Sequence, residues 1–104
     1  MLKMTILYHH PADAAAFEKY YAEKHFPIAV KMPVARVELT KFAPAPDGAA
    51  PAFYRMAELY FADQVQMQAS LTSPEGQAIV ADLPNFATGG VLVLFGEPTT
   101  PAGV

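Results

Sequence analysis

The order of strand-like and helix-like patterns along the chain constrains its fold more than any other feature. Alternating or densely apolar runs predict strands at residues 2–8, 34–42, 53–61 and 91–95. Apolar residues at helical spacing predict a helix over 14–32 and a two-part helix over 63–83. This order predicts an α+β, ferredoxin-like βαββαβ fold with a four-stranded antiparallel sheet.

Capping residues and prolines set the expected limits of these elements. Asp13, Asp63 and Ser73 each stand where a helix N-cap belongs. Pro27 should kink or end the regular helix near residues 24–26, and Pro84 should stop the last helix. The run over 91–95 is so densely apolar that it fits a central strand.

The chain is rich in apolar residues for its length. It has 104 residues, of which 53% are hydrophobic and 16% charged, and this excludes a disordered tail or linker. We expect a single domain over residues 1–104 with an ordered core of about residues 2–97. Two helices cover only one face of such a sheet, and the other face still carries aromatic and Met side chains. We therefore expect a homodimer in which a second copy covers that face across a two-fold axis.

Charge and motif content argue against several classes of function. The net charge is −3 and the seven basic residues are scattered, so we expect no nucleic-acid partner. No apolar run approaches the roughly 18 residues of a membrane span and the N-terminus lacks a secretory pattern, so we expect no membrane partner and a cytoplasmic protein. Cysteines and nucleotide-binding motifs are absent, and the adjacent His9 and His10 should point to opposite sides of a strand end. We expect no metal, no cofactor and a small hydrophobic ligand.

His25 is the first candidate for chemistry. It follows Tyr21 by one helical turn and Phe17 by two, so it shares the helix face that packs on the sheet. An imidazole titrates near pH 6.5 and can act as an acid or a base at neutral pH. Two interpretations stay open. His25 is a catalytic acid/base with Tyr21 orienting the ligand, or it is a buried histidine that holds the helix end to a backbone carbonyl.

The strand over 53–61 supplies further candidates, because Tyr54, Met56, Glu58 and Tyr60 share one of its faces by alternation. If that face lies toward the helices, Glu58 is a carboxylate partner for His25. If it faces a second subunit, Glu58 pairs instead with an arginine such as Arg36. The catalytic candidates are therefore His25, Tyr21 and Glu58, and the candidate ligand-binding residues are Phe17, Tyr54, Met56, Tyr60 and Phe86.

The segment over residues 20–28 resembles the Tyr-x-x-x-His-x-Pro-Leu signature of the EthD family. Tyr21 and His25 stand at the matching positions, and Ile28 replaces the usual leucine. The later stretches 57–61, 73–78, 82–87 and 89–91 are similar to the same family in the same order. The resemblance covers residues 2–97, whereas the pair His9–His10 is not part of the family pattern.

This resemblance implies a dimeric α+β barrel, in which two ferredoxin-like sheets pack face to face with their helices outside. The superfamily includes muconolactone isomerases, polyketide cyclases and small cofactor-free monooxygenases, and the family is named after the degradation of ethyl tert-butyl ether. The family histidine maps onto His25. The implied function is small-molecule binding, with cofactor-free elimination, isomerisation or decarboxylation of an apolar or aromatic compound in catabolism or secondary metabolism. The alternative is a non-catalytic dimeric accessory or stress-linked module.

Overall fold

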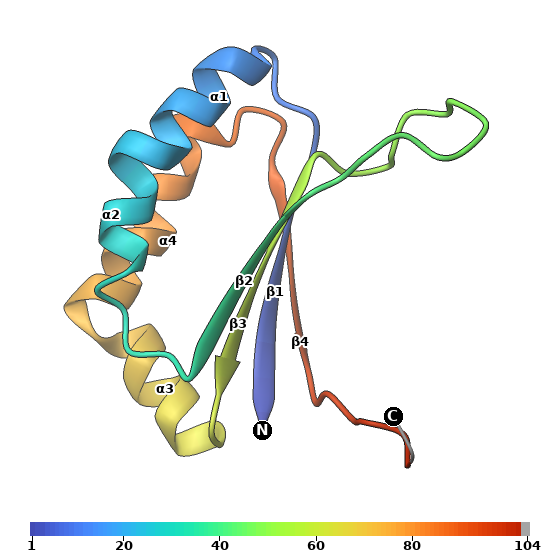
Figure 1. The fold of residues 1–104 in the computed structure, drawn as a ribbon. Coiled ribbons are helices and arrows are strands. Elements are labelled where there is room, and N and C mark those ends of the chain that lie inside the picture. The colour runs from blue at the N-terminus through green and yellow to red at the C-terminus, as the bar shows by residue number, and fades with distance from the viewer. Residues whose placement is uncertain (103–104) are drawn as a thin grey trace.

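The computed structural model describes residues 1–102, and its helices cover one face of a sheet (Figure 1). The strands are β1 (Leu2–Tyr8), β2 (Arg36–Lys41), β3 (Arg55–Phe61) and β4 (Val91–Gly96), in the order β2-β3-β1-β4 with antiparallel neighbours. The predicted α+β, ferredoxin-like fold is confirmed. Residues 103 and 104 of the expected domain lie outside the described residues. No helix in the described part of the chain is long and apolar enough to cross a bilayer.

The first helical segment is one continuous rod. It consists of α1 (Ala14–Tyr20), the π-helix η1 (Tyr21–His25) and α2 (Phe26–Ala29). Asp13 caps the rod, as predicted, by accepting from the Ala16 N–H at 3.1 Å. The prediction for Pro27 needs correction, because the regular α-helix already gives way at Tyr21 and helical turns continue past the proline. The Phe26 N–H donates to Tyr21 O, five residues back, and this wider turn accommodates a residue that has no N–H of its own.

Two further helices, α3 (Gln64–Thr72) and α4 (Pro74–Phe86), follow β3. Asp63 and Ser73 cap them through their side-chain oxygens, as predicted. Pro84 does not stop α4, contrary to the prediction, but lies inside it. A proline this close to the helix end removes one backbone hydrogen bond, and the Ala87 N–H closes the last turn on Leu83 O at 2.9 Å.

Gly76 determines how closely α3 and α4 approach one another. A Cβ at this position would overlap Ser70 O and lie 2.9 Å from Leu71 O, and both are backbone atoms of α3. We expect Gly76→Ala to lower the free energy of unfolding by about 1–3 kcal/mol, despite the better helix propensity of alanine. Urea denaturation measures this, with Gly96→Ala as a matched control because nothing lies within 4 Å of a Cβ there. Equal effects of the two substitutions would contradict the interpretation.

The core lies between the helices and the helix-facing side of the sheet. Met4, Ile6 and Tyr8 of β1 point to this side and are at most 4% exposed. The register places Ile6 opposite Ala57 of β3 and Val93 of β4, so these side chains share the face. The opposite side, here called the open face, consists of Lys3, Thr5, Leu7, Arg36, Glu38, Thr40, Met56, Glu58, Tyr60, Leu92 and Leu94.

β4 is an edge strand and not the central strand that its sequence predicts. It pairs with β1 alone, and residues 92–95 are between 39% and 59% exposed. A continuous apolar run is typical of a strand covered on both faces. Here Leu92 and Leu94 lie on the open face, whereas Val93 and Phe95 lie on the helix side. The run therefore indicates apolar surfaces that a single chain leaves uncovered.

Candidate functional site

His25 and Asp82 form a buried acid–base pair between the first helical rod and α4. His25 is 3% exposed, and its Nδ1 lies 3.0 Å from Asp82 Oδ2. The other carboxylate oxygen, Oδ1, accepts from the Tyr20 hydroxyl at 2.7 Å and from Asn85 Nδ2 at 2.9 Å. These contacts fix the orientation of the carboxylate, which in turn fixes the imidazole ring.

Burial and hydrogen bonding set the charge of each partner. Burial lowers the pKa of His25 below its usual value, although the hydrogen bond to Asp82 acts in the opposite direction. Burial alone would raise the pKa of Asp82, but the hydrogen bonds from Asn85, Tyr20 and His25 outweigh it, and the pKa is lowered. At neutral pH, His25 is therefore neutral and Asp82 is ionised. A carboxylate only accepts hydrogen bonds, so Nδ1 carries the proton and the Nε2 lone pair is available.

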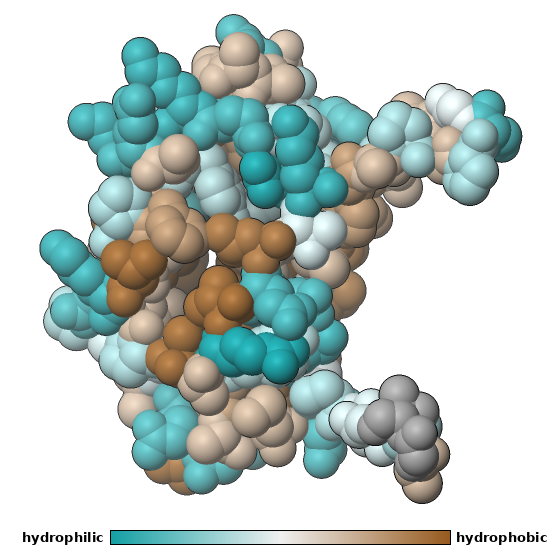
Figure 2. Space-filling model, in the orientation of Figure 1, coloured by the Kyte–Doolittle hydropathy of each residue, from teal (hydrophilic) through white to brown (hydrophobic). Residues whose placement is uncertain are grey.

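His25 also lines a small apolar cavity between the helical rod and the sheet. The other walls include Tyr8, Tyr21, Val37, Leu39 and Ile79. The cavity measures about 30 Å³, roughly the volume of one water molecule. Figure 2 shows hydrophobic side chains gathered around a hollow between the helices and the β2 edge of the sheet. Because Asp82 occupies Nδ1, Nε2 is the ring nitrogen left to meet a ligand there.

Aromatic rings surround the His25–Asp82 pair. The ring of Phe86 lies 4.5 Å from that of His25, centroid to centroid, and the ring of Tyr21 lies 5.7 Å from it. Tyr8 meets Tyr21 edge-on at 5.7 Å, and burial raises the pKa of both phenols. Both hydroxyls therefore keep their protons at neutral pH. The cavity is thus lined by a base and by the side chains of two protonated tyrosines.

An ion pair between α1 and β3 lies next to this aromatic cluster. Arg55 of β3 donates from Nε and Nη2 to the two carboxylate oxygens of Glu18, at 2.9 and 2.6 Å. The hydrogen bonds from Arg55 lower the pKa of Glu18. The guanidinium lies 5.4 Å from the centre of the Tyr21 ring. Arg55 therefore links α1 to β3 and packs against one of the cavity phenols.

The EthD domain pattern matches residues 9–90 of this chain. The chain belongs to the EthD family. An uncharacterised 11.0 kDa protein in the thcB–thcC intergenic region of Rhodococcus erythropolis is 40% identical over 100 residues, which cover 96% of this chain and 97% of that protein. An EthD family protein from Bacillus halodurans has a crystal structure with a TM-score of 0.87 and 31% identity, covering 95% of this chain and 99% of that one. The family predicted from sequence is confirmed.

A similarity to a more distant protein concerns the fold alone. SnoaB from Streptomyces nogalater, a cofactor-independent oxygenase, has a TM-score of 0.64 and 14% identity, covering 99% of this chain and 96% of that one. At 14% identity, this similarity shows that the two proteins share a fold, and it says nothing about the site.

The structure brings part of the predicted site together. Tyr21 and His25 both line the cavity. Phe86 packs on His25, and Phe17 stacks behind Tyr21 with 5.5 Å between ring centroids. Tyr54 precedes β3 instead of sharing a face with it, and its ring contacts Phe17 at 5.1 Å on the helix side. Phe17, Tyr54 and Phe86 therefore support the cavity from behind.

Glu58 lies on the open face and is not the carboxylate partner of His25. Thr5 of β1 stands opposite it, and its Oε2 pairs with Lys3 Nζ at 2.6 Å. The predicted alternative partner, Arg36, bonds instead to Glu38 at 2.7 Å. Met56 and Tyr60 lie on the same open face, away from the cavity.

Asp82 is the important residue that the sequence interpretation did not select. It lies on α4 three residues after Ile79 and four before Phe86, so it shares their buried helix face. A carboxylate on an otherwise apolar helix face is the same signal that singled out His25. Tyr8 of β1 also lines the cavity and was not among the predicted site residues.

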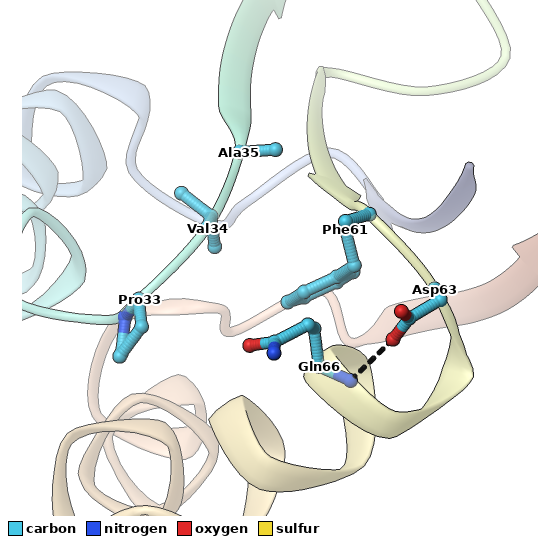
Figure 3. Close-up of a pocket in the computed structure, with 7 residues that line it drawn as sticks. Pro33, Val34, Ala35, Phe61, Asp63 and Gln66 are labelled. Atoms are coloured by element: carbon cyan, nitrogen blue, oxygen red, sulfur yellow. Dashed lines mark hydrogen bonds between the residues drawn. The ribbon is translucent and has the colours of Figure 1, made fainter.

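Another recess lies where α3 begins, close to the end of β3 (Figure 3). It measures about 390 Å³, and its walls include Pro33, Val34, Phe61 and Gln66. Its acidic residue, Asp63, accepts from the Gln66 N–H at 2.8 Å and so serves as the cap of α3. This recess offers no free base, and the His25 cavity is the stronger candidate.

His9 and His10 hold the base of the loop between β2 and β3, which projects away from the body of the molecule (Figure 1). His10 Nε2 donates to Pro51 O at 2.7 Å, and the ring of His9 lies 4.9 Å from that of Phe53. Within residues 1–102, no three His, Cys, Asp or Glu side chains are grouped as ligands for a metal ion. In the described chain, these two side chains contact the base of this loop.

Proposed function

We propose that this EthD protein is a cofactor-free enzyme in which His25 removes a proton from a small apolar or aromatic compound. The observation that carries the proposal is the buried, neutral imidazole whose Nδ1–H is bound to ionised Asp82 while the ring lines an apolar cavity. Asp82 holds the required tautomer and stabilises the imidazolium that forms when Nε2 takes a proton. The similar fold of SnoaB supports cofactor-free chemistry on this architecture.

Once His25 has removed a proton, the fate of that proton and of the substrate anion determines the class of reaction. Returning it to a different atom of the same substrate is an isomerisation, and losing a leaving group from the resulting anion is an elimination. Neither step needs an oxidant or a reductant. The phenols of Tyr8 and Tyr21 can donate to a substrate oxygen that gains negative charge. In a decarboxylation, the imidazolium of His25 would instead supply the proton that replaces carbon dioxide.

Substrate entry requires the cavity to open. The β2 side offers the route, because β2 is an edge strand and its Val37 and Leu39 are 39% and 38% exposed. A movement of β2 away from α2 would open the cavity. The His25–Asp82 pair would stay in place, because it is held between η1 and α4.

Deuterium exchange tests the proposed proton abstraction directly. A panel of small aryl ketones, beginning with acetophenone, is incubated with the protein in D₂O, and deuterium next to the carbonyl is followed by NMR. We expect protein-dependent exchange that rises with pH through the lowered pKa of His25 and then levels off, because the neutral form is the base. His25→Asn should lose at least about 100-fold in rate, whereas His10→Asn should not. Exchange that His25→Asn leaves unchanged would overturn the assignment, as would its absence across the panel.

The second candidate is a non-catalytic accessory module, and the size of the cavity favours it. In the closed form, about 30 Å³ holds no compound larger than water. In this case His25→Ala costs about 1–2 kcal/mol of stability, and neither version binds a ligand.

We infer that two copies pair through the open face to form a dimeric barrel. This face exposes Leu92 at 42% and Leu94 at 48%, next to Leu7 and Met56. The helices cover the other side of the sheet, so an identical face is the matching cover. A stable dimer of this kind buries on the order of 1,200–2,000 Å² in total.

A charge in the apolar part of this face, on the edge strand β4, should separate the subunits. We expect Leu94→Lys to shift the protein from dimer to monomer at micromolar concentration, because two unpaired ammonium groups would be buried across the axis. Sedimentation equilibrium measures the mass. The matched control is Val65→Lys on α3, which is 74% exposed and lies away from the sheet. A wild-type monomer, or a dimer that survives Leu94→Lys, would contradict this assembly.

A further inference from the structure

A second hollow lies on the helix side of the sheet, along the edge strand β4. It measures about 270 Å³, and we call it the β4 groove. Ile79 and Val80 of α4 form one wall, and Val93 and Phe95 of β4 form the other. The residues that line it carry only apolar side chains or, at Gly76, none.

The β4 groove and the His25 cavity are neighbours. Ile6 of β1 and Ile79 of α4 line both hollows, and each is 3% exposed. These two side chains therefore form the partition between a cavity that holds the base and a groove that holds no polar group. A rotamer change at this partition would join the two.

We propose that the two hollows form one bipartite site, which takes a substrate with a polar aromatic or carbonyl head at His25 and a hydrocarbon tail in the β4 groove. The placement of the polar head at His25 rests on the proposed function. The tail rests on the groove itself, since a polar group placed there would find no hydrogen-bond partner among the side chains that line it. A cavity of about 150 Å³ holds benzene, so 270 Å³ accommodates a hydrocarbon group larger than one aromatic ring.

The proposed dimer leaves this groove free. Leu92 and Leu94 face the second copy, whereas Val93 and Phe95 point to the opposite side of the same strand. Val80, Val93 and Phe95 are 55%, 39% and 59% exposed, so the groove opens along its outer rim. A tail longer than the groove can therefore extend past the rim instead of being excluded.

A series of 4-n-alkylphenols, from 4-methylphenol to 4-heptylphenol, tests the proposal by calorimetry. We expect the affinity to rise about fourfold for each added methylene, which corresponds to about 0.8 kcal/mol, until the groove is full. Val93→Trp fills the groove from the strand side and should abolish this increase with chain length. Val80→Trp should do the same from α4. Val65→Trp, at an exposed valine outside both hollows, should keep the full increase.

This experiment tests the binding of the head at His25 and the binding of the tail in the β4 groove independently. His25→Asn should weaken every phenol by the same factor and keep the dependence on chain length, and no effect of His25→Asn would overturn the proposed role of His25. A flat dependence on chain length in the wild type, or one that survives Val93→Trp, would overturn the bipartite site. A change of oligomeric state in Val93→Trp would also overturn it, because the groove would then be an interface between copies.

Discussion

Replacing Phe17 by alanine should lower the free energy of unfolding by about 3–5 kcal/mol. Phe17 is 2% exposed, and its ring lies within 5.5 Å, centroid to centroid, of four other rings. The substitution leaves a void among side chains that are held by both α1 and the sheet, so the site can collapse only partly. Since a domain of this size is stable by about 5–15 kcal/mol, the loss is a large share of the total.

Urea denaturation with wild type and variant in parallel measures this loss. The matched control is Phe95→Ala on β4, where the ring is 59% exposed and its removal should cost less than about 1 kcal/mol. We expect a clear difference in the free energy of unfolding between the two variants. Similar losses would mean that the aromatic cluster behind the cavity is not the centre of the core.

Asp82→Asn should reduce the proposed proton abstraction by about 10²- to 10⁴-fold. The carboxylate accepts from His25 Nδ1 and so leaves Nε2 unprotonated. An amide at this position can donate to Nδ1, which favours the tautomer with the proton on Nε2 and blocks the base. Tyr20 and Asn85 both donate to Oδ1 of Asp82, and an asparagine keeps an oxygen there, so the substitution should change the local structure little.

The ¹⁵N chemical shifts of His25 separate this effect from a loss of structure. We expect the Nδ1–H tautomer in the wild type and the Nε2–H tautomer in Asp82→Asn, with the amide spectrum otherwise preserved. Tyr20→Phe removes one donor from Asp82 and keeps the carboxylate, so its tautomer should remain that of the wild type. An Asp82→Asn variant that keeps both the Nδ1–H tautomer and the exchange rate would show that Asp82 has only a packing role.

The fold was predictable because its local signals agree with one another. Alternation over residues 2–8 predicts both a strand and the side on which Met4, Ile6 and Tyr8 are buried. The caps at Asp13, Asp63 and Ser73 place the helix starts where the structure has them. The prolines were harder to interpret, since a π turn or a nearby helix end can absorb the missing N–H.

The site was predictable only in part, because pattern alone does not say which side of a strand meets which helix. Alternation groups Met56, Glu58 and Tyr60 correctly, yet only the sheet register places them on the open face. In the same way, the apolar run of β4 indicates burial without saying what covers the strand. Asp82 carries a signal as clear as that of His25, and the pairing of the two depends on how α4 crosses the helical rod.

The protonation state of His25 in solution is the most direct measure of whether this imidazole can act as a base. Protein labelled with ¹⁵N in its histidine side chains is titrated by NMR between pH 8 and pH 5, with and without 4-methylphenol. We expect a neutral Nδ1–H imidazole at pH 7, a pKa below the usual value of about 6.5, and a phenol-dependent shift of Nε2 that Nδ1 does not share. An imidazolium at pH 7, or an Nε2 signal that no phenol affects, would contradict the assignment of His25 as the base.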